Sequence, residues 1–418
     1  MTSRSQSISD ALGREPVHPF PARMAASVAL KAISQARRRL TILDPMMGSG
    51  TVLALAKSQG HFASGVDIDP LAVLIGEVWT TPIDKAAVRK HSIEILRKAK
   101  IAFQHKRQRD AYPSNADPET KAFLRYWFDA YTRRQLACLS NQIRQCRNKA
   151  TRRTLWCAFS RLIIAKQAGA SLALDLSHSR PHRVFDTAPK KPFAHFLISV
   201  EIVLRNCLSK GQKKCGPATS IKLGDARQLQ TRSNSIDLVI TSPPYLNAID
   251  YMRCSKFSLV WMGHTASNIR QVRGQSIGSE IGLYDGVNSD QATALLKLLR
   301  INSKLSSRHK AIIRTFIEDM SKVLRETSRV LAPGGKAIFV IGENSIRGTY
   351  VRNAKIISEL AKEFGLRLVE ESSRTLPPNR RYLPPPSKRT NALSSRMRRE
   401  VVLAFSKPKR RAQPLSVD

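Results

Sequence analysis

The sequence predicts an α/β fold with a parallel sheet, and three observations support this prediction. First, a strand at residues 40–43, a glycine-containing turn, a helix through Ala56 and a strand at residues 62–67 form a βαβ unit, and another helix begins at Pro70. Second, the apolar, β-branched run at residues 236–240 ends in two prolines, which cannot continue a sheet ladder. Third, strands and helices alternate again near the carboxyl terminus. Because ligands bind at the carboxyl ends of strands in such sheets, we expect a functional site directly after the run at residues 236–240.

The remaining elements follow from apolar periodicity. Met24, Val28 and Ile33 recur at helical spacing and predict an amphipathic helix at residues 22–37. Residues 247–286 mix aromatic, basic and glycine residues, and we expect a loop-rich segment over the site. Further expected elements are a strand ending at Leu223, helices at 291–299, 311–331 and 354–364, a turn at 333–335 into a strand at 337–341, and strands at 366–370 and 400–405.

A basic, mostly helical region separates the two parts of the α/β pattern. Residues 81–215 hold 28 Lys and Arg against 9 Asp and Glu, a surplus of 19 within a net charge of +39. We interpret this region as an inserted helical subdomain that faces a polyanion, of which nucleic acid is the commonest. The predicted organisation is a discontinuous α/β domain (residues 1–80 and 216–406), the insert, and a basic tail (residues 407–418).

Composition also bears on compartment and partners. No stretch of the sequence approaches the length of a membrane-spanning helix, and the amino terminus (MTSRSQSISDALGREP) lacks the apolar core of a signal peptide. We therefore expect a cytoplasmic protein that has no membrane partner. The six cysteines are widely spaced and form no C-x-x-C pair, which favours reduced thiols and no metal site.

The turn Asp44–Thr51 (DPMMGSGT) is the first candidate binding element. Gly48 and Gly50 allow a positive φ and a close approach of a ligand to the backbone. Asp67 ends the next strand, at the distance where an acidic residue meets a ribose diol in dinucleotide folds. No Gly-Lys-Ser/Thr follows the turn, which favours an adenosine without a pyrophosphate. The alternative is an ordinary βα turn, with Asp67 and Asp69 capping the helix at Pro70.

Four motifs in this order, DPMMGSGT, GVDIDP, LGDA and TSPPY, resemble motifs I to IV of S-adenosylmethionine-dependent methyltransferases. His18–Met24 (HPFPARM) is similar to motif X of the DNA amino-methyltransferases. This resemblance implies a Rossmann-like class I methyltransferase sheet with a basic helical insertion, and S-adenosyl-L-methionine as the cofactor. It also implies a cofactor site that comprises Phe20, Asp44, Gly48, Gly50, Thr51, Asp67, Ile68 and Asp225. In that site Asp67 takes the ribose hydroxyls and Asp225 accepts from the adenine amine, although Asp225 also suits a plain turn.

The TSPPY turn is the catalytic candidate, with Ser242, Pro243, Pro244 and Tyr245. An exocyclic base amine is a poor nucleophile, because its lone pair is delocalised into the ring. Acceptors at its two protons favour a pyramidal nitrogen, and the Ser242 hydroxyl and the Pro243 carbonyl can supply them. A base inside a duplex must be flipped out, and Tyr245 offers a face on which it can stack.

The leading interpretation is a DNA methyltransferase that modifies an exocyclic amine. The resemblance favours cytosine N4, since family members with Ser in this motif often methylate that atom, whereas Asp is typical of adenine N6. Adenine-N6 methylation of DNA, methylation of an RNA base, and a non-catalytic nucleic-acid-binding protein with a degenerate fold remain the alternatives. The expected partner is DNA, with RNA as runner-up and a cognate restriction endonuclease as a further candidate. Either the insert or residues 247–286 reads the target sequence.

Overall fold

The computed structural model describes residues 7–21, 24–107, 110–174, 176, 181–211, 216–246, 251–278, 290–298, 305–346, 349–375 and 399–409. The chain divides into two compact units. Unit 1 comprises Met1–Arg37, Met47–Leu223 and Asp250–Gln275, and unit 2 comprises Arg38–Met46, Gly224–Ile249 and Ser276–Asp418. The domain boundaries expected at residues 81, 216 and 407 stay predictions.

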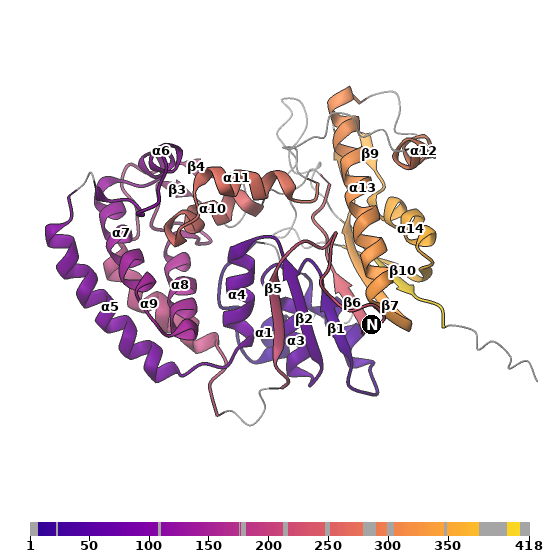
Figure 1. Cartoon of the computed structure of the whole chain (residues 1–418), viewed down its shortest axis with the longest axis horizontal. Coiled ribbons are helices and arrows are strands. Elements are labelled where there is room, and N and C mark those ends of the chain that lie inside the picture. Colours follow the sequence, from indigo (N-terminus) through magenta and orange to yellow (C-terminus); the bar gives the residue numbers. More distant parts are fainter. Residues whose placement is uncertain are drawn as a thin grey trace, which may run out of the picture. The chain divides into compact units, whose positions relative to one another are not determined.

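A seven-stranded mixed sheet confirms the predicted α/β class (Figure 1). Its strands lie in the order β10 (Arg367–Thr375), β11 (Arg399–Ser406), β7 (Leu331–Gly342), β6 (Ile236–Thr241), β1 (Thr41–Asp44), β2 (Phe62–Asp67) and β5 (Thr219–Leu223). β6 pairs in parallel with β1 and β7, and β2 pairs in parallel with β5. β11 is antiparallel to both of its neighbours, so the sheet is mixed at this edge and parallel at the βαβ unit from which it was predicted.

Unit 1 contains the part of the βαβ element that follows β1, and the helical insert. The glycine turn leads into α3 (Thr51–Ser58), then β2, then α4 (Pro70–Thr80), close to the predicted bounds. Two helices precede this element, α1 (Ile8–Leu12) and α2 (Ala26–Ser34). The insert is mainly helical, as predicted, with a short β3–β4 hairpin (Ala173–Leu174 and His182–Arg183). Its helices are α5 (Lys85–His105), α6 (Pro118–Trp127), α7 (Ala130–Arg144), α8 (Lys149–Ile163) and α9 (Pro192–Asn206).

Two further helices lie where a loop-rich segment was expected, so that expectation was wrong in its described part. They are α10 (Tyr251–Met262) and α11 (Ala266–Gln275), and Figure 1 shows them beside the insert helices. Phe257 and Trp261, one helical turn apart on α10, are both buried. Their rings meet Phe128 at centroid distances of 6.1 and 5.4 Å. Burial of these aromatic side chains against the insert stabilises α10.

Unit 2 places β6 beside β7, with the long helix α13 (Ser307–Val330) leading into β7 (Figure 1). The turn predicted at residues 333–335 lies within β7, where the register with β6 shifts, since Ile236 pairs with Leu331 whereas Leu238 pairs with Lys336. Gly334 adopts a φ of +81°, which a side chain would strain. The remaining elements are α12 (Asp290–Leu298), β8 (Asn344–Ile346), β9 (Thr349–Val351) and α14 (Asn353–Glu363).

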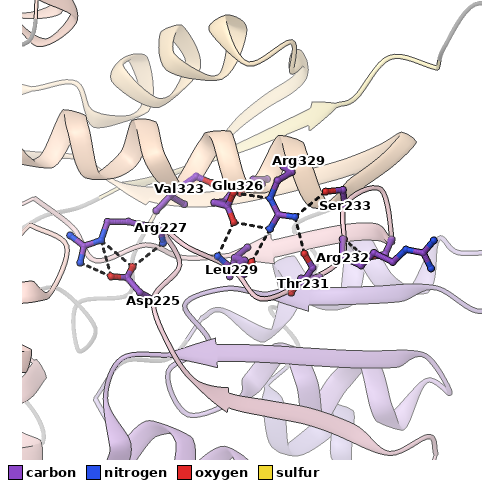
Figure 2. A network of polar contacts seen from close by, with 11 residues as sticks. Asp225, Arg227, Leu229, Thr231, Arg232, Ser233, Val323, Glu326 and Arg329 are labelled. Atoms are coloured by element: carbon purple, nitrogen blue, oxygen red, sulfur yellow. Dashed lines mark hydrogen bonds and ion pairs between the residues drawn. The ribbon is translucent and has the colours of Figure 1, made fainter.

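The segment that enters β6 is held by polar contacts with α13 (Figure 2). Glu326 accepts a hydrogen bond of 2.8 Å from the backbone N–H of Leu229. Arg329 pairs with Glu326 and donates to the carbonyls of Leu229 and Thr231. These bonds satisfy backbone groups of an irregular segment, so they fix the path by which the chain reaches β6.

In the part of the chain that the structure describes, no helix combines the length and apolar character needed to cross a lipid bilayer.

Candidate active site

The strand order changes direction between β1 and β6, which are adjacent and parallel. Ligands of open α/β sheets bind at such a switch point, outside the carboxyl ends of the strands. Asp44 ends β1, and Thr241 ends β6. The buried Thr241 hydroxyl donates a hydrogen bond of 2.8 Å to the buried Asp44 carboxylate. The first residue of the glycine turn and the residue before Ser242 are therefore joined directly.

The TSPPY turn lies at this edge, as the sequence predicted. Ser242 Oγ donates to the backbone carbonyl of Val340 on β7 at 3.1 Å, and lies 3.5 Å from the Tyr245 hydroxyl. Tyr245 in turn donates to Glu400 on β11 at 2.7 Å. Pro243 is buried, whereas Ser242, Pro244 and Tyr245 are partly exposed. The turn therefore keeps three of its four candidate residues within reach of solvent.

The glycine turn adopts the backbone conformation for which its glycines were singled out. Gly48 and Gly50 have φ values of +52° and +83°. A Cβ atom on Gly50 would lie 3.2 Å from Cα of Gly76 on α4, so the turn packs closely on that helix. Gly50 also precedes the first residue of α3, whose early N–H groups point out of the helix end. A side chain at Gly50 would both strain the turn and crowd α4.

Asp67 and Asp69, which the sequence left as two candidate caps, have different roles. Asp69 is the N-cap of α4 and accepts from the Leu71 N–H at 2.8 Å. Asp67 instead accepts from the Gly48 N–H at 2.8 Å and from the Asp69 N–H at 2.9 Å. It joins the end of β2 to the glycine turn, and a carboxylate has more acceptor sites than these backbone groups fill. This arrangement favours the binding role for Asp67 over the capping role.

Both carboxyls hold protons more tightly than ordinary aspartates. Burial raises the pKa of Asp67 to about 6, against the lowering effect of backbone N–H groups from Asp69, Gly48 and Ile68. Burial and the neighbouring Asp67 charge raise the pKa of Asp69 to about 7, although Ser255 on α10 donates to it. Perturbed carboxyls gather at functional sites, which is consistent with a ligand at this turn.

Three further candidate residues of unit 1 flank these groups. Phe20 is buried and belongs to the hydrophobic core around α4, so its part in binding a ligand stays a prediction. Thr51 is the first residue of α3 and is also buried. Ile68, between Asp67 and Asp69, is partly exposed, as packing on a ligand ring requires.

Asp225 has a partner that the sequence did not predict. Arg227 donates to it through its backbone N–H and its guanidinium, with the shortest contact at 2.6 Å (Figure 2). The same guanidinium pairs with the buried Asp319 on α13, also at 2.6 Å. Asp225 is thus anchored in a turn, the alternative noted from the sequence, and its role towards an adenine amine stays a prediction.

Sequence reasoning missed the residues that hold the catalytic candidates. Val340 contributes its backbone carbonyl, and because every residue type has one, the sequence could not indicate this contact. Glu400 and Arg374 lie 155 and 129 positions from Tyr245 in the sequence. The sequence signal for this contact was the acidic side chain of Glu400 within an apolar strand pattern. Asn247 and Asp250, which follow the TSPPY turn, lie outside the described residues.

The described residues contain no group of three or more His, Cys, Asp or Glu side chains that could hold a metal ion.

No family model matches the chain. It is 22% identical over 419 residues to the type II methyltransferase M.MvaI of Kocuria varians, an alignment that covers 92% of this chain and 89% of that protein. It is also 22% identical to the type II methyltransferase M.BsoBI of Geobacillus stearothermophilus, in an alignment that covers 79% of this chain and 74% of that protein. A solved S-adenosylmethionine-dependent methyltransferase from Methanosarcina mazei aligns over 91% of this chain and 97% of its own, at 8% identity and a TM-score of 0.33. Over most of its length, the chain is a distant homologue of type II DNA methyltransferases.

Proposed function

We infer that the protein is a DNA methyltransferase of a restriction-modification system, and that it transfers a methyl group from S-adenosyl-L-methionine to N4 of cytosine. Its distant relatives are type II methyltransferases, which supports the assignment to DNA modification. The net charge of +39 suits a phosphate backbone as partner. The choice of N4 over adenine N6 follows from the resemblance at Ser242, since family members with Ser in this motif often methylate cytosine N4, whereas Asp is typical of adenine N6.

The single observation that carries this proposal is the direction of the Ser242 hydroxyl bond. A serine hydroxyl has one proton to donate and two lone pairs that accept. Ser242 donates its proton to the Val340 carbonyl at 3.1 Å. Its Oγ can therefore meet a ligand only as an acceptor, which is what an amine nitrogen needs at one of its protons. The Pro243 carbonyl accepts the second proton, because proline fixes the backbone that carries it.

The residues of the glycine turn fit an adenosyl cofactor. Gly48 and Gly50 let the backbone approach the ligand, and Asp67 ends β2 with lone pairs that can accept from ribose hydroxyls. The bound cofactor supplies a methyl group on a sulfonium, which is already activated for transfer. The protein therefore supplies positioning and charge stabilisation, without a covalent nucleophile. Tyr245 stacks on the flipped base.

The experiment that tests the proposal uses radiolabelled S-adenosylmethionine with purified protein. Duplex plasmid DNA, tRNA and rRNA are offered separately at equal nucleotide concentration. We expect label in the duplex DNA, and label that decreases steeply as salt is raised, because binding releases counterions. Transfer to tRNA or rRNA in preference to DNA would replace this proposal with an RNA methyltransferase. Absence of transfer to any of the three would support the non-catalytic alternative.

A further inference from the structure

The hydroxyl of Tyr245 is held by a carboxylate from the far end of the sequence. Tyr245 donates to Oε1 of Glu400 at 2.7 Å, and Glu400 is only 6% exposed. A phenol that donates to a buried carboxylate makes one of the stronger protein hydrogen bonds, because the acceptor is charged and water is excluded. The ring of Tyr245 is therefore fixed at both ends, by the backbone of the proline turn and by its hydroxyl.

A second contact holds the carboxylate itself. Arg374 Nε donates to the other oxygen, Oε2, of Glu400 at 2.6 Å. Arg374 and Glu400 are direct cross-strand partners of β10 and β11, and Glu400 also pairs in register with Gly342 at the end of β7. An isolated buried carboxylate would be costly, and the contact with Arg374 offsets this cost and orients Glu400.

The same chain of contacts reaches the catalytic serine. The hydroxyl oxygen of Tyr245 lies 3.5 Å from Ser242 Oγ. The same Tyr245 hydroxyl donates its proton to Glu400. With its proton committed to the carboxylate, the phenol oxygen can only accept from Ser242. Ser242 has a single proton, and whether it points to the Val340 carbonyl or to Tyr245, the Ser242 lone pairs are left for a ligand.

We propose that Glu400, braced by Arg374, is a positioning residue that holds the Tyr245 ring in the orientation in which it stacks on the target base. This inference rests on the proposed function. A ring held in advance loses less conformational freedom when the base arrives, so the flipped state is reached more often. Glu400 does not touch the reacting atoms, and its effect passes through Tyr245.

The test compares substitutions that keep or remove the acceptor for the phenol. Glu400→Gln keeps an amide oxygen for Tyr245, Glu400→Leu removes it, and Tyr245→Phe removes the donor. Glu371→Leu is the matched control, since Glu371 is an exposed acid on the neighbouring strand β10. Each variant is measured for kcat and KM on plasmid DNA, for cofactor affinity by calorimetry, and for melting temperature.

We expect Glu400→Leu and Tyr245→Phe each to lower kcat by about tenfold or more, which corresponds to roughly 1.4 kcal/mol. The double variant should be no slower than the slower single variant, because both remove the same bond. Glu400→Gln should recover most of the rate, and cofactor affinity should stay within twofold throughout. A role in folding alone would instead lower the melting temperature and leave kcat of the folded fraction unchanged.

The outcomes separate this inference from the proposed function. Suppose that the wild-type protein methylates DNA. The positioning role is then overturned if Glu400→Leu keeps the wild-type kcat, or if the losses in kcat of the two single variants multiply in the double variant. Either result leaves the methyltransferase assignment intact. A wild-type protein that methylates no nucleic acid overturns both. A Glu400→Leu protein that fails to fold shifts the decision to Glu400→Gln and Tyr245→Phe, which keep the volume of the site. Unchanged kcat in Tyr245→Phe then overturns the inference.

Discussion

The Thr241 hydroxyl donates a hydrogen bond of 2.8 Å to the Asp44 carboxylate, and both side chains are buried. The bond joins the carboxyl ends of β1 and β6, and so it links the first residue of the glycine turn to the residue before Ser242. Motifs that lie 197 positions apart in the chain share this edge of the sheet. We attribute the placement of the TSPPY turn to this contact and to the strand pairing beneath it.

Thr241→Val replaces the hydroxyl by a methyl group of similar size. We expect a loss of about 1–3 kcal/mol in the free energy of unfolding, because a buried acceptor loses its donor. Urea denaturation measures this loss. In a double-mutant cycle with Asp44→Ala, the two losses should be less than additive by at least about 0.5 kcal/mol. Strict additivity would show that the two side chains do not depend on each other.

Ser242→Ala removes the proposed acceptor for the base amine. We expect kcat to fall by about 10²-fold or more, the usual effect of losing one charge-stabilising group in an active site. Cofactor affinity, measured by calorimetry, should change by less than twofold. Ser235→Ala is the matched control, since Ser235 directly precedes β6, at the end opposite Ser242, and its hydroxyl donates to the Arg232 carbonyl. An equal loss of cofactor affinity in Ser242→Ala would contradict the assigned role.

The raised pKa of Asp67 predicts how cofactor binding depends on pH. With a pKa of about 6, Asp67 is protonated at pH 5 and ionised at pH 7. The ionised form accepts from two ribose hydroxyls, so affinity should fall by about tenfold between pH 7 and pH 5. Asp67→Asn should bind weakly and show a flat profile, whereas Asp69→Asn should keep the slope. A slope that persists in Asp67→Asn would assign the titration to another group.

Arg227 is expected to matter for stability because it neutralises a buried acid. Arg227→Met leaves Asp319, whose side chain is 6% exposed, without its cation. Loss of one partner of such a pair costs about 3 kcal/mol at neutral pH. The double variant Arg227→Met with Asp319→Leu should recover most of the stability, because no buried charge remains. Chemical denaturation decides, and a wild-type midpoint for Arg227→Met alone would refute the structural role of the pair.

Local pattern accounts for much of the fold. The predicted strand at residues 62–67 matches β2, and the strand at 236–240 matches β6 within one residue, because short apolar runs bounded by turn residues leave few alternatives. Helices α10 and α11 were missed because their apolar residues are interleaved with basic ones. Phe257 and Trp261 are buried by the insert, a partner that local sequence does not reveal.

The site was predictable where residue types carry the chemistry. The positive φ values of Gly48 and Gly50, and the position of Asp67 at the end of β2, follow from motif and spacing. The contacts of Ser242 and Tyr245 could not be predicted, because one partner is a backbone carbonyl and the other lies on a strand 155 residues away. The register of β6 with β7 determines the first contact, and the register of β7 with β11 places Glu400 for the second.

The measurement that bears most directly on the central claim is the identity of the methylated nucleoside. DNA methylated by the purified protein is digested to nucleosides, which are separated and identified by mass. An acceptor-only Ser242 Oγ in a motif that resembles the cytosine enzymes predicts N4-methyldeoxycytidine. N6-methyldeoxyadenosine as the product, or no methylated nucleoside at all, would contradict the account.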